Sequence, residues 1–169
     1  MRGSYLTSSM TTARDVYQGW ETYHRRFIRA ISPLTQEQLG FRTAESLRSI
    51  GDICRHVIGA RARWCEQILG LNGDTLSSLG QWDAREAPER SAIELVDGLQ
   101  GSWAALWDAL GAWTIADLTH SIPNPDREPG EPEVFTRQWV IWHLIEHDLH
   151  HGGEVSLILG SHQLSGIDI

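Results

Sequence analysis

Four histidines lie within nine residues in the segment HLIEHDLHH, which runs from His143 to His151. The apolar residues around them have the spacing of a helix, on which side chains four positions apart lie on one face. His143, His147 and His151 are therefore expected to project in one direction, as metal ligands would. His150 is turned by about 100° from His151 around the helix and is expected to face solvent or another helix.

A third ligand has to come from elsewhere in the chain, and His56 is the obvious donor. It follows Ile53 by three residues and precedes Ala60 by four, which places it on or beside the buried stripe of another predicted helix. Helical geometry leaves open whether His143 or His151 completes a site with His56 and His147. Each imidazole nitrogen buried without a partner costs on the order of 1 to 3 kcal/mol, whereas a shared cation satisfies several together. The pattern therefore predicts a metal site.

Three neutral imidazoles leave coordination positions open, which is typical of catalytic rather than structural zinc. At such a position water is acidified into a nucleophile, or a thiol is held as its reactive thiolate. Zinc is the leading candidate for the divalent metal, and nickel, iron and manganese also suit imidazole ligands. The neighbouring carboxylates Glu146, Asp148 and Glu154 could orient a ligand imidazole, but they are expected to be mainly solvated helix charges.

Composition excludes several classes of protein. The net charge of −8 disfavours binding to nucleic acid and to anionic membrane surfaces. All 14 basic residues are arginine, so no lysine is present for Schiff-base chemistry. Residues 1–14 lack the apolar stretch of a secretory signal, and no apolar run approaches the length of a membrane span, so a cytoplasmic location is expected. Cys54 and Cys65 lie too far apart on one predicted helix to form a disulfide and are expected to be buried free thiols.

The helices that must position these residues are predicted from apolar periodicity. Ser49 is expected to cap the second helix and Gly70 to end it. Residues 71–90 are expected to form a surface link, and residues 119–133, which contain four prolines, to form a loop. No strand is expected. The pattern predicts an all-α, antiparallel four-helix bundle in a single domain over 1–169, with long helices at 11–31, 49–69, 91–112 and 135–159.

Side chains outside the histidine cluster are also assigned by periodicity. The third helix is expected to bury Ile93 together with Leu99 and Trp103. The arginines of the second helix, Arg55, Arg61 and Arg63, are expected on the surface. The aromatic residues near the histidines are expected mainly in the core, although they could line a pocket. They are Trp20, Tyr23, Trp139 and Trp142.

Three segments resemble the DinB-like superfamily of four-helix metalloproteins, and the resemblance spans nearly the whole chain. They are LTQEQL, the helical pattern SIGDICRHV, and EHDLHHGGE in the last helix. The resemblance implies that His56, His147 and His151 are the metal ligands and leaves His143 as the unselected alternative. Many members carry Arg-Gly-Gln after the double histidine, whereas this chain has Gly-Gly-Glu at 152–154. A cation near the metal is thereby replaced by a carboxylate.

The superfamily includes bacillithiol S-transferases and is related to mycothiol-dependent maleylpyruvate isomerase. The resemblance therefore implies a metal-dependent thiol S-transferase, in which a divalent metal activates a low-molecular-weight thiol towards a small electrophilic substrate. It also implies a homodimer formed through a helix face, which is common in the family. Two alternatives stay open: a metal-dependent hydrolase, and a non-enzymatic binding or stress protein in which the metal only stabilises the bundle.

Overall fold

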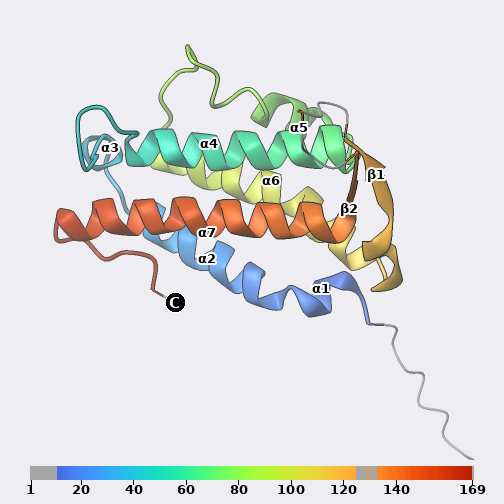
Figure 1. Cartoon of the computed structure of the whole chain (residues 1–169). Coiled ribbons are helices and arrows are strands. Elements are labelled where there is room, and N and C mark those ends of the chain that lie inside the picture. Colours follow the sequence, from blue (N-terminus) through green and yellow to red (C-terminus); the bar gives the residue numbers. More distant parts are fainter. Residues whose placement is uncertain (1–10, 125–128, 130–132, 169) are drawn as a thin grey trace, which may run out of the picture.

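Four long helices, α2 (Gln18–Ile31), α4 (Ile50–Arg63), α6 (Ala92–Ala112) and α7 (Arg137–Ser161), pack side by side along most of the molecule (Figure 1). The computed structural model describes residues 11–124, 129 and 133–168. The predicted all-α four-helix bundle is confirmed. Among the described residues, no helix combines the length and the apolarity that crossing a bilayer requires. The elements are α1 (Ala13–Val16), α2 (Gln18–Ile31), α3 (Gln36–Leu39), α4 (Ile50–Arg63), the π-helical turn η1 (Trp64–Ile68), α5 (Asp74–Leu79), α6 (Ala92–Ala112), the 3-10 turn η2 (Ala116–Thr119), β1 (Ser121–Pro123), β2 (Val134–Thr136) and α7 (Arg137–Ser161).

The four long helices run as two opposed pairs, with α2 and α7 in one direction and α4 and α6 in the other (Figure 1). Since α4 and α6 follow one another among the long helices and run parallel, the segment between them must return along the bundle. This segment was expected to be only a surface link, and that expectation is wrong in part. It contains α5, whose Leu76 and Leu79 are buried against the core.

Three of the long helices, α4, α6 and α7, begin at a serine or threonine whose side chain accepts from a free N–H group of the first turn. Ser49 Oγ accepts from the Asp52 N–H at 3.2 Å, and the Asp52 carboxylate accepts from the Ser49 N–H at 3.1 Å. The predicted start of the second helix is therefore confirmed. Its end is also confirmed, because Gly70 has a φ of +68°, a left-handed conformation that glycine adopts without strain.

The core is formed by apolar side chains that all four long helices point inward, and two details differ from expectation. The predicted helix over 11–31 is interrupted at Tyr17, which separates α1 from α2. Ile93 is 75% exposed rather than buried. The buried stripe of α6 follows Leu95, Leu99, Leu106 and Leu110, and at about 100° per residue Ile93 lies well outside it.

A short antiparallel ribbon closes one end of the bundle, where no strand was expected. In it Ile122 of β1 pairs with Phe135 of β2. Pro123 is tolerated at the end of such a two-stranded ribbon, where its missing N–H breaks no central ladder. Phe135 consequently belongs to a strand, and α7 begins two residues later with Thr136 as its N-cap. Residues 125–128 and 130–132 of the predicted loop lie outside the described residues.

Candidate metal site

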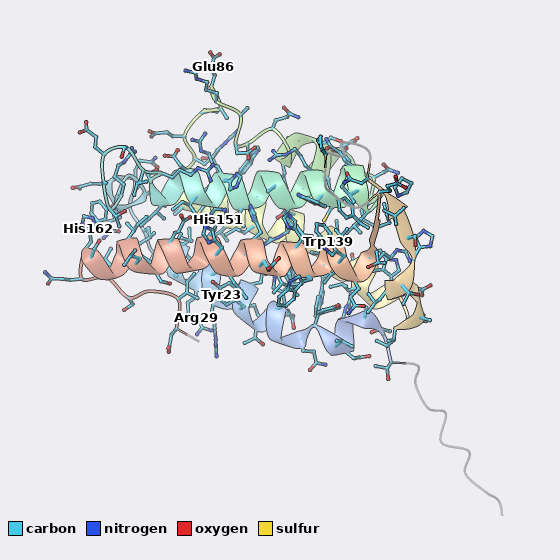
Figure 2. All side chains as sticks on the ribbon, viewed as in Figure 1. Tyr23, Arg29, Glu86, Trp139, His151 and His162 are labelled. Carbon is cyan, nitrogen blue, oxygen red and sulfur yellow. The ribbon has the colours of Figure 1, made fainter. Side chains whose placement is uncertain are left out.

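His56 of α4 and the pair His147 and His151 of α7 meet where these two antiparallel helices face each other. Nε2 of His147 lies 3.1 Å from Nε2 of His56. One ring nitrogen from each of the three residues lies within 4.8 Å of the others. Figure 2 shows His151 in the space between α4 and α7. We call these three residues the histidine trio.

The dimensions of the trio fit a divalent cation. A zinc ion lies about 2.0 to 2.1 Å from a ligand nitrogen, and tetrahedral angles then put two such nitrogens roughly 3.3 Å apart. The observed separation of 3.1 Å between Nε2 of His56 and Nε2 of His147 is close to this value. The trio therefore has both the donor type and the spacing that a small divalent metal needs.

Two carboxylates hold the outer ring nitrogens of His56 and His151. His56 Nδ1 lies 3.0 Å from Asp83 Oδ2, and His151 Nδ1 lies 2.6 Å from Glu154 Oε2. Asp83 also accepts from Arg63, with Nη2 2.9 Å from Oδ2. A carboxylate on Nδ1 fixes the ring orientation and favours the tautomer that presents the lone pair of Nε2 to a metal.

Burial favours the neutral form of the two α7 imidazoles in the trio. Burial lowers the pKa of His147 to about 3, and the neighbouring His151 and His56 add to the effect. Burial also lowers the pKa of His151, although the hydrogen bond to Glu154 opposes the shift. At Asp83 burial favours the neutral acid, but the bonds from Arg63 and His56 prevail and lower its pKa. Neutral imidazoles beside an ionised carboxylate are the protonation states that a metal site requires.

His143 and His150 lie outside the trio. The His143 ring packs against Trp64 at a centroid distance of 4.4 Å, and its centroid is 6.4 Å from that of His147. His150 is exposed, as its position on the helix predicts, and its Nε2 lies 3.7 Å from Glu154 Oε1. A second grouping of His150, His151 and Glu154 also has the spacing of metal ligands, but all three come from α7 and two are exposed.

The remaining histidines serve elsewhere. His24 is buried and stacks on Trp103 at 4.5 Å, and burial lowers its pKa to about 2. His162 stacks on Phe41 at 3.9 Å. His120 is exposed near the β-ribbon.

The two free cysteines are buried, as expected. Burial raises the pKa of both thiols, Cys54 and Cys65, to about 12. Thiols with such pKa values stay protonated and unreactive near neutral pH. The chain therefore does not supply its own sulfur nucleophile at the trio.

Two charged residues near the trio were wrongly expected on the surface. Asp148 is 1% exposed, and its Oδ2 accepts from Arg61 Nη2 at 2.8 Å and from Trp20 Nε1 at 2.7 Å. Arg61 is completely buried and also donates to Leu99 O and Ser102 Oγ. Helical spacing assigns a side chain to a face but does not reveal an oppositely charged partner that allows it to be buried.

Asp83 and Arg63, which support His56, are not indicated as site residues by any pattern in the sequence. Asp83 lies in the segment expected to be a surface link. Such a segment has no apolar periodicity from which the position of a side chain could be predicted. The available signal was Trp82, a large apolar residue among polar ones. Trp82 packs over Gly98 of α6 and so brings the adjacent Asp83 to the bundle.

Two cavities border the site. One of about 310 Å³ lies on the His143 side, and we call it the aromatic pocket because four of its lining residues carry rings. Another of about 490 Å³ lies on the other side and is lined in part by His151, Glu154 and Ile53. The aromatic pocket is lined by Arg63, Trp64, Gln67, Ile68, Asn124, Phe135, Trp139 and His143.

Comparison with solved structures shows that the whole fold is similar to that of DinB-like proteins. A DinB-like protein from Bacillus cereus ATCC 10987 superposes with a TM-score of 0.74 at 22% sequence identity, over 95% of this chain and 99% of that one. A DinB-like protein from Bacillus subtilis gives a TM-score of 0.64 at 14% identity, over 91% and 96%. None of the curated sequences compared with the chain is significantly similar to it. The sequence pattern of the DinB superfamily matches residues 20–155, a range that contains the whole trio, and the chain belongs to this superfamily.

Proposed function

We propose that His56, His147 and His151 bind a divalent cation, most readily zinc, in an enzyme that transfers a low-molecular-weight thiol to a small electrophile. The observation that carries the proposal is the convergence of three imidazoles from two helices, two of them oriented by carboxylates. Only three protein ligands gather there among the described residues, which leaves room for a substrate atom, as in catalytic zinc sites.

The buried cysteines support an external thiol as the nucleophile. When bound, a divalent cation supplies positive charge that lowers the pKa of a thiol or water beside it. The chain contributes the fixed imidazoles and an opening at His56, which remains partly exposed. Asp83 and Glu154 hold two of the rings, so that little reorganisation is needed when substrate arrives.

The ligand assignment is tested by elemental analysis of protein purified without an affinity tag. We expect His56→Ala and His147→Ala each to lose stoichiometric metal, because each removes one of three ligands. His150→Ala is the matched control on the same helix and should retain the metal. Equal loss of metal in all three variants would show that the wrong residues have been chosen.

The reaction is tested by a thiol-conjugation screen with and without a chelator. We expect thiol consumption with an electrophile that stops on chelation and returns when the metal is restored. Turnover of esters or amides without added thiol would instead identify a metal-dependent hydrolase. A large fall in melting temperature on chelation, without activity of either kind, would identify a metal that only stabilises the bundle.

A further inference from the structure

Aromatic rings follow one another along a single face from the β-ribbon to the histidine trio. They occur every fourth residue: Phe135 and Trp139 stack at 4.3 Å, and Trp139 and His143 at 5.4 Å with nearly parallel planes. His143 is followed by His147 at 6.4 Å. Figure 2 shows Trp139 and His151 along the side of α7 that faces α4, with Trp139 nearer to the β-strands. The rings thus connect the aromatic pocket to the trio.

Trp64 forms the opposite wall of the aromatic pocket. Its ring lies 5.8 Å from Phe135, 6.1 Å from Trp139 and 4.4 Å from His143. It is the first residue of the π-helical turn that ends α4, and such turns often occur at functional sites. Trp139 is 40% exposed, so packing in the core does not explain its position. Half of the lining residues of the pocket therefore offer ring surfaces to a ligand.

The lining of the aromatic pocket includes no member of the trio, but two of its residues lead to the trio, one on each helix. On α7 its lining residue His143 is the neighbour of His147, one turn along the helix. On α4 its lining residue Arg63 binds Asp83, which in turn holds His56. The pocket is thus separated from His147 by His143 alone, and from His56 by Arg63 and Asp83.

The charge of the pocket restricts the ligand. Arg63 already donates to Asp83 and to the carbonyl of Gly80, so its positive charge is largely compensated. Among the described residues no carboxylate lines the pocket, and Gln67 adds an uncharged amide. A volume of about 310 Å³ is at the lower end of the range of small-molecule sites, roughly 300 to 1,000 Å³. These features suit a small, flat, uncharged molecule that stacks on aromatic rings.

We propose that the aromatic pocket binds a planar aromatic or conjugated compound, which is the electrophilic substrate of the trio. This inference rests on the proposed function and adds to it the chemical class of the electrophile. With 1-chloro-2,4-dinitrobenzene as a probe, a C–S bond forms as the C–Cl bond breaks. Chloride leaves with the bonding electrons, and the proton of the thiol passes to solvent.

Binding is tested first, without any reaction. We titrate 1,3-dinitrobenzene, which is planar and has no leaving chloride, into the protein and measure the dissociation constant by calorimetry. Trp139→Ala should weaken binding about three- to tenfold, because it removes a stacking surface. Trp142→Ala is the matched control, since this tryptophan lies on the same helix, is 56% exposed and does not line the pocket. Equal effects of the two variants, or no effect of Trp139→Ala, would overturn the pocket assignment.

Kinetics with two electrophiles then separate this inference from the proposed function. We expect Trp139→Ala to raise KM for 1-chloro-2,4-dinitrobenzene about three- to tenfold, with KM for the small aliphatic iodoacetamide and the metal content unchanged. Phe135→Leu provides a second test of the same wall. A proportional rise in both KM values would contradict a pocket selective for aromatic electrophiles. Stacking-dependent binding of 1,3-dinitrobenzene without metal-dependent thiol transfer would overturn the proposed function and retain the pocket as an aromatic ligand site.

Discussion

Asp83 fixes the orientation of the His56 ring through its contact with Nδ1, so it is more than a solvated surface charge. We expect Asp83→Asn to weaken metal affinity about 10- to 100-fold, since the ligand imidazole loses its charged hydrogen-bond partner. Competition with a chromophoric chelator at fixed pH measures the effect. Asp97→Asn, at an exposed position of α6, is the control and should leave the affinity unchanged. An unaltered metal affinity in Asp83→Asn would show that His56 does not depend on this carboxylate.

Burial of His147 makes the stability of the metal-free protein depend on pH. The pKa of His147 is about 3 in the folded protein, against about 6.5 in an unfolded chain. Between these values the unfolded state binds more protons, so the free energy of unfolding falls with decreasing pH. The contribution of the neutral His147 side chain to the free energy of unfolding is fully present above pH 6.5 and is lost progressively towards pH 3. His24, with a pKa of about 2, acts in the same direction.

Urea unfolding of the metal-free protein at pH values between 7.5 and 5.0 measures this dependence above the range in which carboxyl groups titrate. We expect His147→Asn to reduce the loss of stability over this interval. His150→Asn, at the exposed histidine of the same helix, should behave as the parent chain does. A pH dependence that is identical in all three proteins would contradict a buried, neutral His147.

The ligand candidates could be predicted from sequence because helical spacing alone places His147 and His151 on one face. Helical spacing does not choose between His151 and His143, since both lie four residues from His147, and His151 is preferred only through the resemblance to the DinB-like superfamily. The structure separates them through their partners: His143 packs on Trp64, whereas His151 meets Glu154 and His56. Such partners come from distant segments, and periodicity within one helix carries no information about them.

At the scale of elements, the two central glycines of α7 have different roles. A Cβ at Gly152 would overlap the hydroxyl of Tyr23 and lie 3.2 Å from Ile167 Cδ1, whereas a Cβ at Gly153 would meet nothing within 4 Å. We expect Gly152→Ala to destabilise the protein by about 1 to 3 kcal/mol through overpacking of α7 against α2. Gly153→Ala should stabilise it by up to about 1 kcal/mol through higher helix propensity.

Urea unfolding of the two variants gives the comparison directly. The double variant Gly152→Ala/Tyr23→Ala should lose less stability than the sum of the two single changes, because the overlap disappears with the ring. Equal effects of the two glycine substitutions would show that α7 and α2 do not approach each other through Gly152.

The long helices could be predicted from sequence because caps and apolar stripes are local signals, as at Ser49 and Gly70. The short elements could not. In α5 only Leu76 and Leu79 are buried, too few to establish a period. The strands β1 and β2 have three residues each and are defined by their pairing with one another. Their formation depends on contacts between segments, which the sequence around each strand does not specify.

At the scale of the whole molecule, two polar centres join the helices. The histidine trio connects α4 to α7, and the buried pair of Arg61 and Asp148 connects all four long helices. Arg61 of α4 donates to α6 through Leu99 and Ser102, and Asp148 of α7 accepts from Trp20 of α2. Because Asp148 follows His147 directly, the ion pair also fixes how far α7 is displaced along α4. We infer that it helps to hold the trio in register.

The loss of stability on breaking the ion pair of Arg61 and Asp148 tests whether this pair holds the helices together. Removing one partner leaves a buried charge uncompensated, and we expect Asp148→Leu to destabilise the metal-free protein by about 3 to 5 kcal/mol. The double variant Arg61→Met/Asp148→Leu should be less destabilised than Asp148→Leu alone, because no unpaired charge remains. Glu21→Gln removes a partner of the exposed Arg25 and should cost less than about 1 kcal/mol. Urea unfolding measures all three variants, and a double variant at least as unstable as Asp148→Leu alone would contradict the coupling of Arg61 to Asp148.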